Sequence, residues 1–229
     1  MIPHMARRRF LTTLGAGLLA GPTVMGASVA PLRSARAETT PSDSLDFTVL
    51  RDGTEIGSHT LRFQHDGART LVDIDINLEV GIGPLVLYRY VHQNREVWED
   101  GKFMRFESRT DDDGDDYAVT ATRQDNDILV DRKPAEDYRI DRADLLPTTY
   151  WNEATVRQKV LLDTQKGRRM DVAVEDLGWE EITAGGKSVS ARKYSVGGDL
   201  DLTLWYDESG RWVKLIFPLK GSTFEYVMR

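Results

Sequence analysis

The sequence contains no cysteine, and only four of its 229 residues are histidine. The first absence excludes disulfide bonds, thiolate zinc sites, iron–sulfur clusters and covalently attached haem. His59 and His65 lie close together on one expected strand, but two nitrogen ligands are too few for a tight zinc site without carboxylates from elsewhere. We therefore predict neither a metal nor a cofactor.

Catalytic motifs are also missing. There is no Gly-x-Ser-x-Gly, no phosphate-binding glycine loop and no Gly-x-Gly-x-x-Gly opening a helix. A pair of carboxylates could act as acid and base, but 37 acidic side chains leave no basis for choosing one pair. No catalytic residue is assigned, and an enzyme that uses carboxylates and His92 stays an alternative.

Long hydrophobic runs are absent after residue 37. The one apolar stretch, Leu14 to Ala30, is rich in glycine and alanine, contains Pro22, and falls short of the ~20 strongly apolar residues of a membrane span. We expect no membrane span in the mature chain. The alternative for this stretch is an uncleaved membrane anchor.

The residues around that stretch predict export. Arg7 and Arg8 form the paired arginines of a Tat signal, and Ala35-Arg36-Ala37 has the small-x-small form of a cleavage site. We expect residues 1–37 to be a cleaved signal peptide, with the Tat translocase as partner during export and the periplasm as destination. Residues 38–44 are expected to be a loose leader, and residues 45–229 a single domain.

Basic charge is scarce in the expected mature chain. Five of the 30 basic side chains and none of the acidic ones precede Glu38, which leaves 25 against 37, a net charge of −12. Such a charge repels nucleic acid and anionic lipid surfaces, so we predict no nucleic-acid partner. A face kept charged for solubility explains it, and an acidic interaction or assembly protein is an alternative.

The acidic run Asp111–Asp116 has the composition of a calcium loop but not its spacing. In an EF-hand starting at Asp111, position six would be glycine and position twelve glutamate, whereas this chain has Asp116 and Thr122. We interpret the run as a solvent-facing hairpin tip.

Alternation and turn signals predict an all-β fold. Asp-Gly and Gly-Gly pairs recur along the chain, and residues 72–80 alternate strictly between apolar and polar side chains. Short loops between about a dozen strands make an antiparallel meander, and so many strands are expected to close into a barrel or half-barrel.

One glycine-free segment, residues 141–158, lacks both the strand alternation and the glycine turns of the rest of the chain. Pro147 suits the first turn of a helix, so we expect one short helix near residues 145–156. Tyr150 and Trp151 would lie near its centre and could plug one end of the barrel.

The expected strand at residues 88–98 carries the candidate ligand site. Its even positions mix aromatic and hydrogen-bonding side chains, which is typical of a ligand cavity. We predict a site lined by Tyr88, Tyr90, His92 and Trp98, with Tyr150 and Trp151 closing one end. The alternative is an ordinary barrel wall in which the aromatic rings cover both faces.

Four local patterns resemble a known family. They are Asp52-Gly53-Thr54-Glu55-Ile56-Gly57, Trp98-Glu99-Asp100-Gly101, Pro147-Thr148-Thr149-Tyr150-Trp151-Asn152, and Trp205-Tyr206-Asp207 with Gly210-Arg211-Trp212. Together they resemble a family of exported bacterial proteins of unknown function, over most of residues 45–229. The resemblance implies an antiparallel barrel or half-barrel, distantly similar to the lipoprotein carriers whose curved sheet wraps an apolar cavity. We therefore expect a periplasmic protein that binds a lipid-like or other small apolar ligand.

Overall fold

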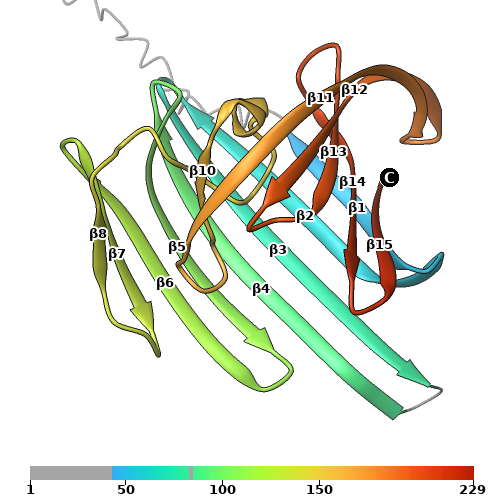
Figure 1. Cartoon of the computed structure of the whole chain (residues 1–229), viewed down its shortest axis with the longest axis horizontal. Coiled ribbons are helices and arrows are strands. Elements are labelled where there is room, and N and C mark those ends of the chain that lie inside the picture. The colour runs from blue at the N-terminus through green and yellow to red at the C-terminus, as the bar shows by residue number, and fades with distance from the viewer. Residues whose placement is uncertain (1–42, 83–84) are drawn as a thin grey trace, which may run out of the picture. The chain divides into compact units, whose positions relative to one another are not determined.

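The computed structural model describes residues 43–82 and 85–229. The expected signal peptide, residues 1–37, and most of the expected leader lie outside the described residues. Within them, no helix is long and apolar enough to cross a membrane. The described elements form one large sheet with a single turn of 3₁₀ helix (Figure 1).

In chain order the elements are β1 (Ser44–Arg51), β2 (Thr54–Asp66), β3 (Arg69–Ile82), β4 (Leu85–Glu99), β5 (Lys102–Asp112), β6 (Asp115–Gln124), β7 (Asp127–Lys133), β8 (Tyr138–Ile140), β9 (Leu146–Pro147), the helix η1 (Glu153–Arg157), β10 (Val160–Leu162), β11 (Arg169–Ala184), β12 (Lys187–Gly198), β13 (Leu202–Asp207), β14 (Trp212–Leu219) and β15 (Ser222–Met228).

The strand order confirms the antiparallel meander. Each strand from β1 to β7 pairs with the next, and so does each strand from β10 to β14; β1 joins the two series by pairing with both β2 and β15. The edges are β8 and β9, and β9 pairs with β10 in parallel. The sheet is therefore curved but not closed, which is the half-barrel form of the predicted fold.

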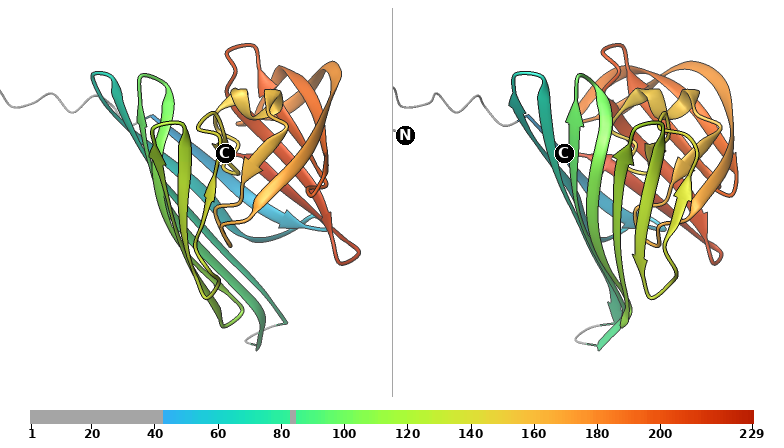
Figure 2. Two further views of the ribbon diagram at one scale, coloured as in Figure 1. Left: turned by 60° about the vertical axis from the view of Figure 1, so that its left-hand side comes forward. Right: turned by 90° about the vertical axis from the view of Figure 1, so that its left-hand side faces the viewer.

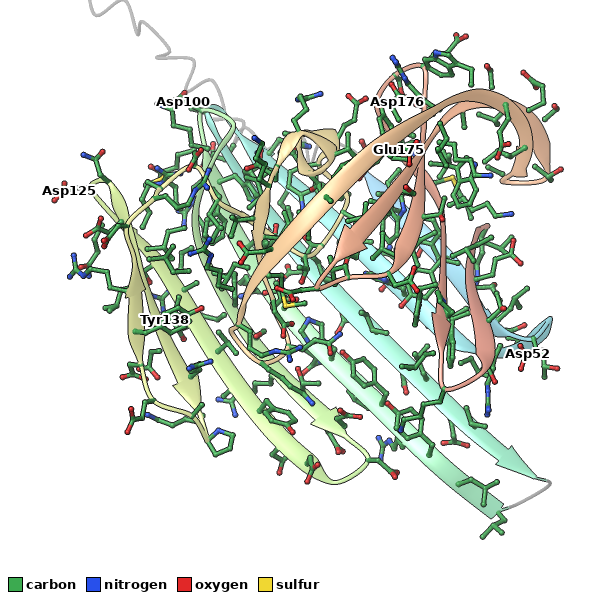
Figure 3. All side chains as sticks on the ribbon, in the orientation of Figure 1. Asp52, Asp100, Asp125, Tyr138, Glu175 and Asp176 are labelled. Atoms are coloured by element: carbon green, nitrogen blue, oxygen red, sulfur yellow. The ribbon has the colours of Figure 1, made fainter. Side chains whose placement is uncertain are left out.

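Aspartate and glycine turns join the long hairpins, as their sequences predict. Asp52, Asp100 and Asp125 lie at the tips of the β1–β2, β4–β5 and β6–β7 hairpins (Figure 3) and have φ angles of 50°, 49° and 54°. Short polar side chains tolerate this left-handed conformation better than others do. The acidic run also forms a hairpin tip, but a tight one, because only Asp113 and Gly114 lie outside β5 and β6.

The alternating side chains of β3 point as expected. Val72, Ile74, Ile76 and Leu78 are buried, whereas Asp75 on the opposite face is exposed. These residues belong to one large core on the concave face of the sheet. A smaller cluster around Trp205 forms a separate core.

Residues 141–168, here called the crossing segment, lie within the curl of the sheet (Figure 2). Leu145, Leu161 and Leu162 are completely buried in the main core. The helix is shorter and starts later than expected: Pro147 lies in β9, and Tyr150 and Trp151 precede η1 instead of occupying its centre. The cause is local, because Asn152 caps η1 by accepting a hydrogen bond from the Ala154 N–H at 2.9 Å.

Candidate functional site

Strand β4 presents a row of polar and aromatic side chains to the interior. Its even positions from residue 90 onward are all buried, whereas the odd positions are exposed or half-buried. The buried row consists of Tyr90, His92, Asn94, Glu96 and Trp98. Alternate residues of a strand share a face, so these groups all point to the interior, where His92, Glu96 and Trp98 contact the crossing segment.

At one end of the row, four side chains form what we call the Glu96 cluster: Asn94, Glu96, Trp98 and Trp151. The Glu96 carboxylate accepts from the indole N–H groups of Trp98 at 2.8 Å and Trp151 at 2.9 Å, and from the Asn94 amide at 3.1 Å. The two indole rings meet edge to face with centroids 4.9 Å apart. The cluster ties the crossing segment to the sheet through a buried carboxylate.

Burial acts on the Glu96 carboxyl more strongly than its partners do. It raises the pKa of Glu96, while hydrogen bonds led by those from Trp151 and Trp98 act in the opposite direction. Each carboxylate oxygen nevertheless has at least one donor. The cluster is thus occupied by protein groups and leaves little room for a ligand.

Tyr150 and Trp151 are neighbours in sequence but serve different sites. Tyr150 has a φ of 60°, an unusual left-handed conformation for a bulky residue, and its carbonyl accepts from the Tyr206 hydroxyl at 2.6 Å. Tyr150 lines a cavity, whereas Trp151 reaches Glu96. The turn therefore directs one of the two residues to the cavity and the other to the Glu96 cluster.

The cavity, here called the His59 pocket, has a volume of about 300 Å³. Buried side chains from the sheet form its inner part, and they include His59, Ile74, Ile76, His92, Leu215 and Tyr226. Arg168, Asp199 and Asp201 also line it and are exposed, so they mark its mouth. Arg168 is paired with Asp163, the Nε atom lying 3.2 Å from Oδ2.

His59 is the most unusual group of this pocket. It is only 4% exposed, and neither of its ring nitrogens has a hydrogen-bond partner among the described residues. Instead the ring packs edge-on against Trp212 and Tyr226, each with its centroid 5.4 Å away. Buried polar groups in proteins are almost always hydrogen-bonded, so two free nitrogens beside a cavity indicate a group available to a ligand.

Both buried histidines are neutral at physiological pH. Burial, with a smaller contribution from the nearby His92 ring, lowers the pKa of His59 to about 3, and burial lowers the pKa of His92 to about 4. His92 differs in having partners: its Nδ1 lies 2.8 Å from the Thr110 hydroxyl and its Nε2 lies 3.5 Å from the Thr164 hydroxyl. His92 therefore joins β4 to β5 and the crossing segment.

Four of the six residues predicted to line a ligand site are divided between the two ends, and the other two lie in neither. His92 and Tyr150 line the His59 pocket, and Trp98 and Trp151 belong to the Glu96 cluster. Tyr90 is buried without lining the pocket, and its hydroxyl has no partner among the described residues. Tyr88 is half-buried and donates to Asp112 at 2.9 Å.

Sequence reasoning considered His59 only as a metal ligand and gave Glu96 no role. The sequence carries a signal for His59, because His59 alternates with Leu61 and Phe63 along β2. The structure buries all three side chains. A single histidine on an otherwise apolar strand face does not match the spacing of metal ligands, but it predicts a buried imidazole. The described residues contain no group of three or more histidine or acidic side chains placed to hold a metal ion.

Comparison with known proteins gives a fold and a family. The structure is similar to a crystal structure described as a beta-barrel-like protein of domain of unknown function DUF1849 from Brucella abortus, with a TM-score of 0.59 and 12% identity over 82% of this chain and 95% of that one. At this identity the likeness shows the fold alone. No curated protein matches the sequence. Residues 47–229 match the domain of unknown function DUF6134, and because this match covers most of the sequence, the chain belongs to the DUF6134 family.

Proposed function

We propose that this protein binds a small apolar or amphipathic molecule in the His59 pocket and that it does so in the periplasm. The observation that carries the proposal is the combination of a cavity of about 300 Å³ with a buried histidine whose two nitrogens have no partner among the described residues. A packed core would have filled this space with side chains.

The composition of the pocket supports a small and mostly apolar ligand. Ligand sites are clefts of about 300–1,000 Å³ with largely apolar walls and a few polar groups that fix orientation. This pocket lies at the lower end of that range, and apolar side chains of β3, β11, β13, β14 and β15 line it. Its size favours a single short chain or ring system over a molecule with several long acyl chains.

The enzyme alternative receives less support from this geometry. A general base needs a partner that orients it, yet among the described residues no carboxylate forms a hydrogen bond with His59 or His92. Of the carboxylates that line the pocket, those of Asp199 and Asp201 lie at its exposed mouth, and that of the buried Asp163 is paired with Arg168. This arrangement suits binding more than proton transfer.

A direct test of binding uses the protein purified from the periplasm of its own bacterium. Native mass spectrometry should show a co-purified small molecule, and this mass should be lost in an Ile76→Phe variant whose larger side chain fills the pocket. Asp75→Asn changes the neighbouring exposed side chain and serves as the control. Equal ligand occupancy in both variants would argue against the His59 pocket as the site.

The location is tested separately through the paired arginines. Replacing both Arg7 and Arg8 with lysine should leave the precursor in the cytoplasm, because the Tat pathway recognises that pair. Cell fractionation and immunoblotting measure the distribution. Normal periplasmic levels of the double variant would rule out the Tat assignment.

A further inference from the structure

The inner end of the His59 pocket limits the kind of polar group that a ligand can carry. The buried His59 ring, whose two nitrogens have no partner within residues 43–82 and 85–229, lines the pocket together with Ile74, Ile76 and Leu215, which are also buried. A neutral imidazole has one nitrogen that donates and one that accepts. Whichever tautomer His59 adopts, a ligand hydroxyl can complement it, since a hydroxyl both donates and accepts.

Charged groups fit this position poorly. A carboxylate or an ammonium loses its hydration on entering an apolar pocket and recovers it only beside an opposite charge. The charged side chains that line the pocket are Asp163, Arg168, Asp199 and Asp201. Arg168, Asp199 and Asp201 are exposed at the mouth, and the buried Asp163 is already paired with Arg168. Among the described residues, therefore, no unpaired counter-charge lines the inner end.

The mouth disfavours one of these charged groups, the carboxylate. Two exposed acidic side chains and one exposed basic side chain line it, a balance that repels anions approaching the pocket. Phe217 and Tyr226 also line the cavity, and their rings meet edge to face with centroids 6.2 Å apart. They offer apolar contact to a chain or ring that follows the hydroxyl inward.

We propose that the ligand of the His59 pocket is an uncharged, hydroxyl-bearing apolar molecule, an alcohol or a phenol, bound with its hydroxyl inward on His59. This inference rests on the proposed binding function and adds the chemical class and the orientation. It also separates this pocket from sites for fatty acids, whose carboxylate would have to be buried without a cation.

The test compares three molecules with the same chain and different head groups: octanol, octanoate and octylammonium. Each is titrated calorimetrically into the purified full-length protein at neutral pH. We expect saturable binding of octanol and binding at least about tenfold weaker for the two ions, which lose hydration without gaining a partner. This comparison uses the unmodified protein and does not depend on any variant folding.

A pair of histidine variants then locates the hydroxyl. His59→Phe keeps the ring but removes both nitrogens, so octanol binding should weaken by about tenfold. His65→Phe is the control, because His65 lies on the same strand, is exposed, and contacts Thr70 instead of the pocket. Thermal unfolding checks that both variants fold.

The outcomes separate the two proposals. Octanoate or octylammonium binding as tightly as octanol would overturn the hydroxyl inference and leave the pocket standing as an amphiphile site. Unchanged octanol binding in a folded His59→Phe variant would also overturn it. No binding of any of the three molecules would count against the binding function itself.

Discussion

The Glu96 cluster and the His59 pocket lie along the same concave face, and both combine buried polar side chains with aromatic rings. They differ in how many of their polar atoms are hydrogen-bonded. Around Glu96, both carboxylate oxygens and both indole N–H groups are paired, and only the Asn94 carbonyl oxygen is without a partner among the described residues. Around His59, both ring nitrogens are without one.

This difference separates a structural role from a binding role. A satisfied buried network fixes one arrangement of the chain, since any change leaves a donor or acceptor unpaired. A buried group without a partner contributes nothing to that specificity and costs free energy. The cluster therefore holds the crossing segment in place, and the pocket retains its histidine for something other than stability.

The largest expected effect comes from removing a ring of the cluster. Trp98→Ala deletes a 2% exposed side chain that packs on Phe103 and Trp151 and donates to Glu96. We expect it to lower the free energy of unfolding by about 4–5 kcal/mol. Urea unfolding followed by circular dichroism gives the value.

Ile76→Ala is the matching change at the pocket. It enlarges a space that already exists, so its cost should lie near the lower limit for such substitutions, about 2 kcal/mol. Equal losses from Trp98→Ala and Ile76→Ala would mean that the two ends are packed alike, which contradicts a filled cluster beside a hollow pocket.

The next effect tests the carboxylate itself. Glu96→Ala leaves two indole N–H groups and an amide without their acceptor, and each unpaired buried donor costs about 1–3 kcal/mol. After allowing for the relieved burial of a charge, we expect a loss of roughly 3 kcal/mol. Glu96→Gln keeps one acceptor oxygen for the indoles and should lose about 1 kcal/mol. If the two variants unfold at the same urea concentration, hydrogen bonding to Glu96 is not what stabilises the cluster.

Acidification should affect the two ends in opposite directions. The folded pKa values of about 3 for His59 and about 4 for His92 lie below the unfolded value near 6.5, so the unfolded chain binds more protons between these limits. The contribution of each neutral histidine to the free energy of unfolding is therefore fully present above pH 6.5. It falls by about 2 kcal/mol as the pH drops to 5. The raised pKa of Glu96 has the opposite effect on the free energy of unfolding. The folded chain binds a proton at Glu96 more readily than the unfolded chain does, so acidification favours the folded state through this group.

Two variants resolve these contributions. His59→Phe should lose about 2 kcal/mol less than the unmodified protein between pH 7 and pH 5, whereas Glu96→Gln should lose slightly more than it. Urea unfolding at both pH values provides the comparison. Parallel losses in all three proteins would show that neither group titrates as its burial requires.

The sequence predicted the scaffold better than the site. Alternation at residues 72–80 and the Asp-Gly turns depend on local rules, and both appear in the structure as expected. The helix near residues 145–156 was placed too early, because the positive φ of Tyr150 and the cap at Asn152 together override the preference of Pro147 for a first turn.

The site depends on contacts that local rules do not contain. The mixed polar and aromatic row on β4 is evident in the sequence, but no pattern there says that Trp151 turns toward Glu96 while Tyr150 lines the His59 pocket. Those directions come from one backbone angle and from packing between segments more than fifty residues apart. Such information becomes visible only once the chain is folded.

The smallest expected effect is also the most discriminating. His59→Phe replaces a buried ring by one of similar shape and removes two polar atoms that have no partner among the described residues. Removing each buried, unpaired polar atom should raise the free energy of unfolding by about 1–3 kcal/mol. Fitting a slightly larger ring beside Phe47, Trp212 and Tyr226 should lower it. We therefore expect the free energy of unfolding at pH 7 to change by less than about 1 kcal/mol, against roughly 3 kcal/mol for Glu96→Ala. A loss above 2 kcal/mol, measured by urea unfolding without added ligand, would mean that His59 is hydrogen-bonded in solution and stabilises the fold, as Glu96 does. A near-neutral result would leave ligand recognition as the reason for a buried histidine at this position.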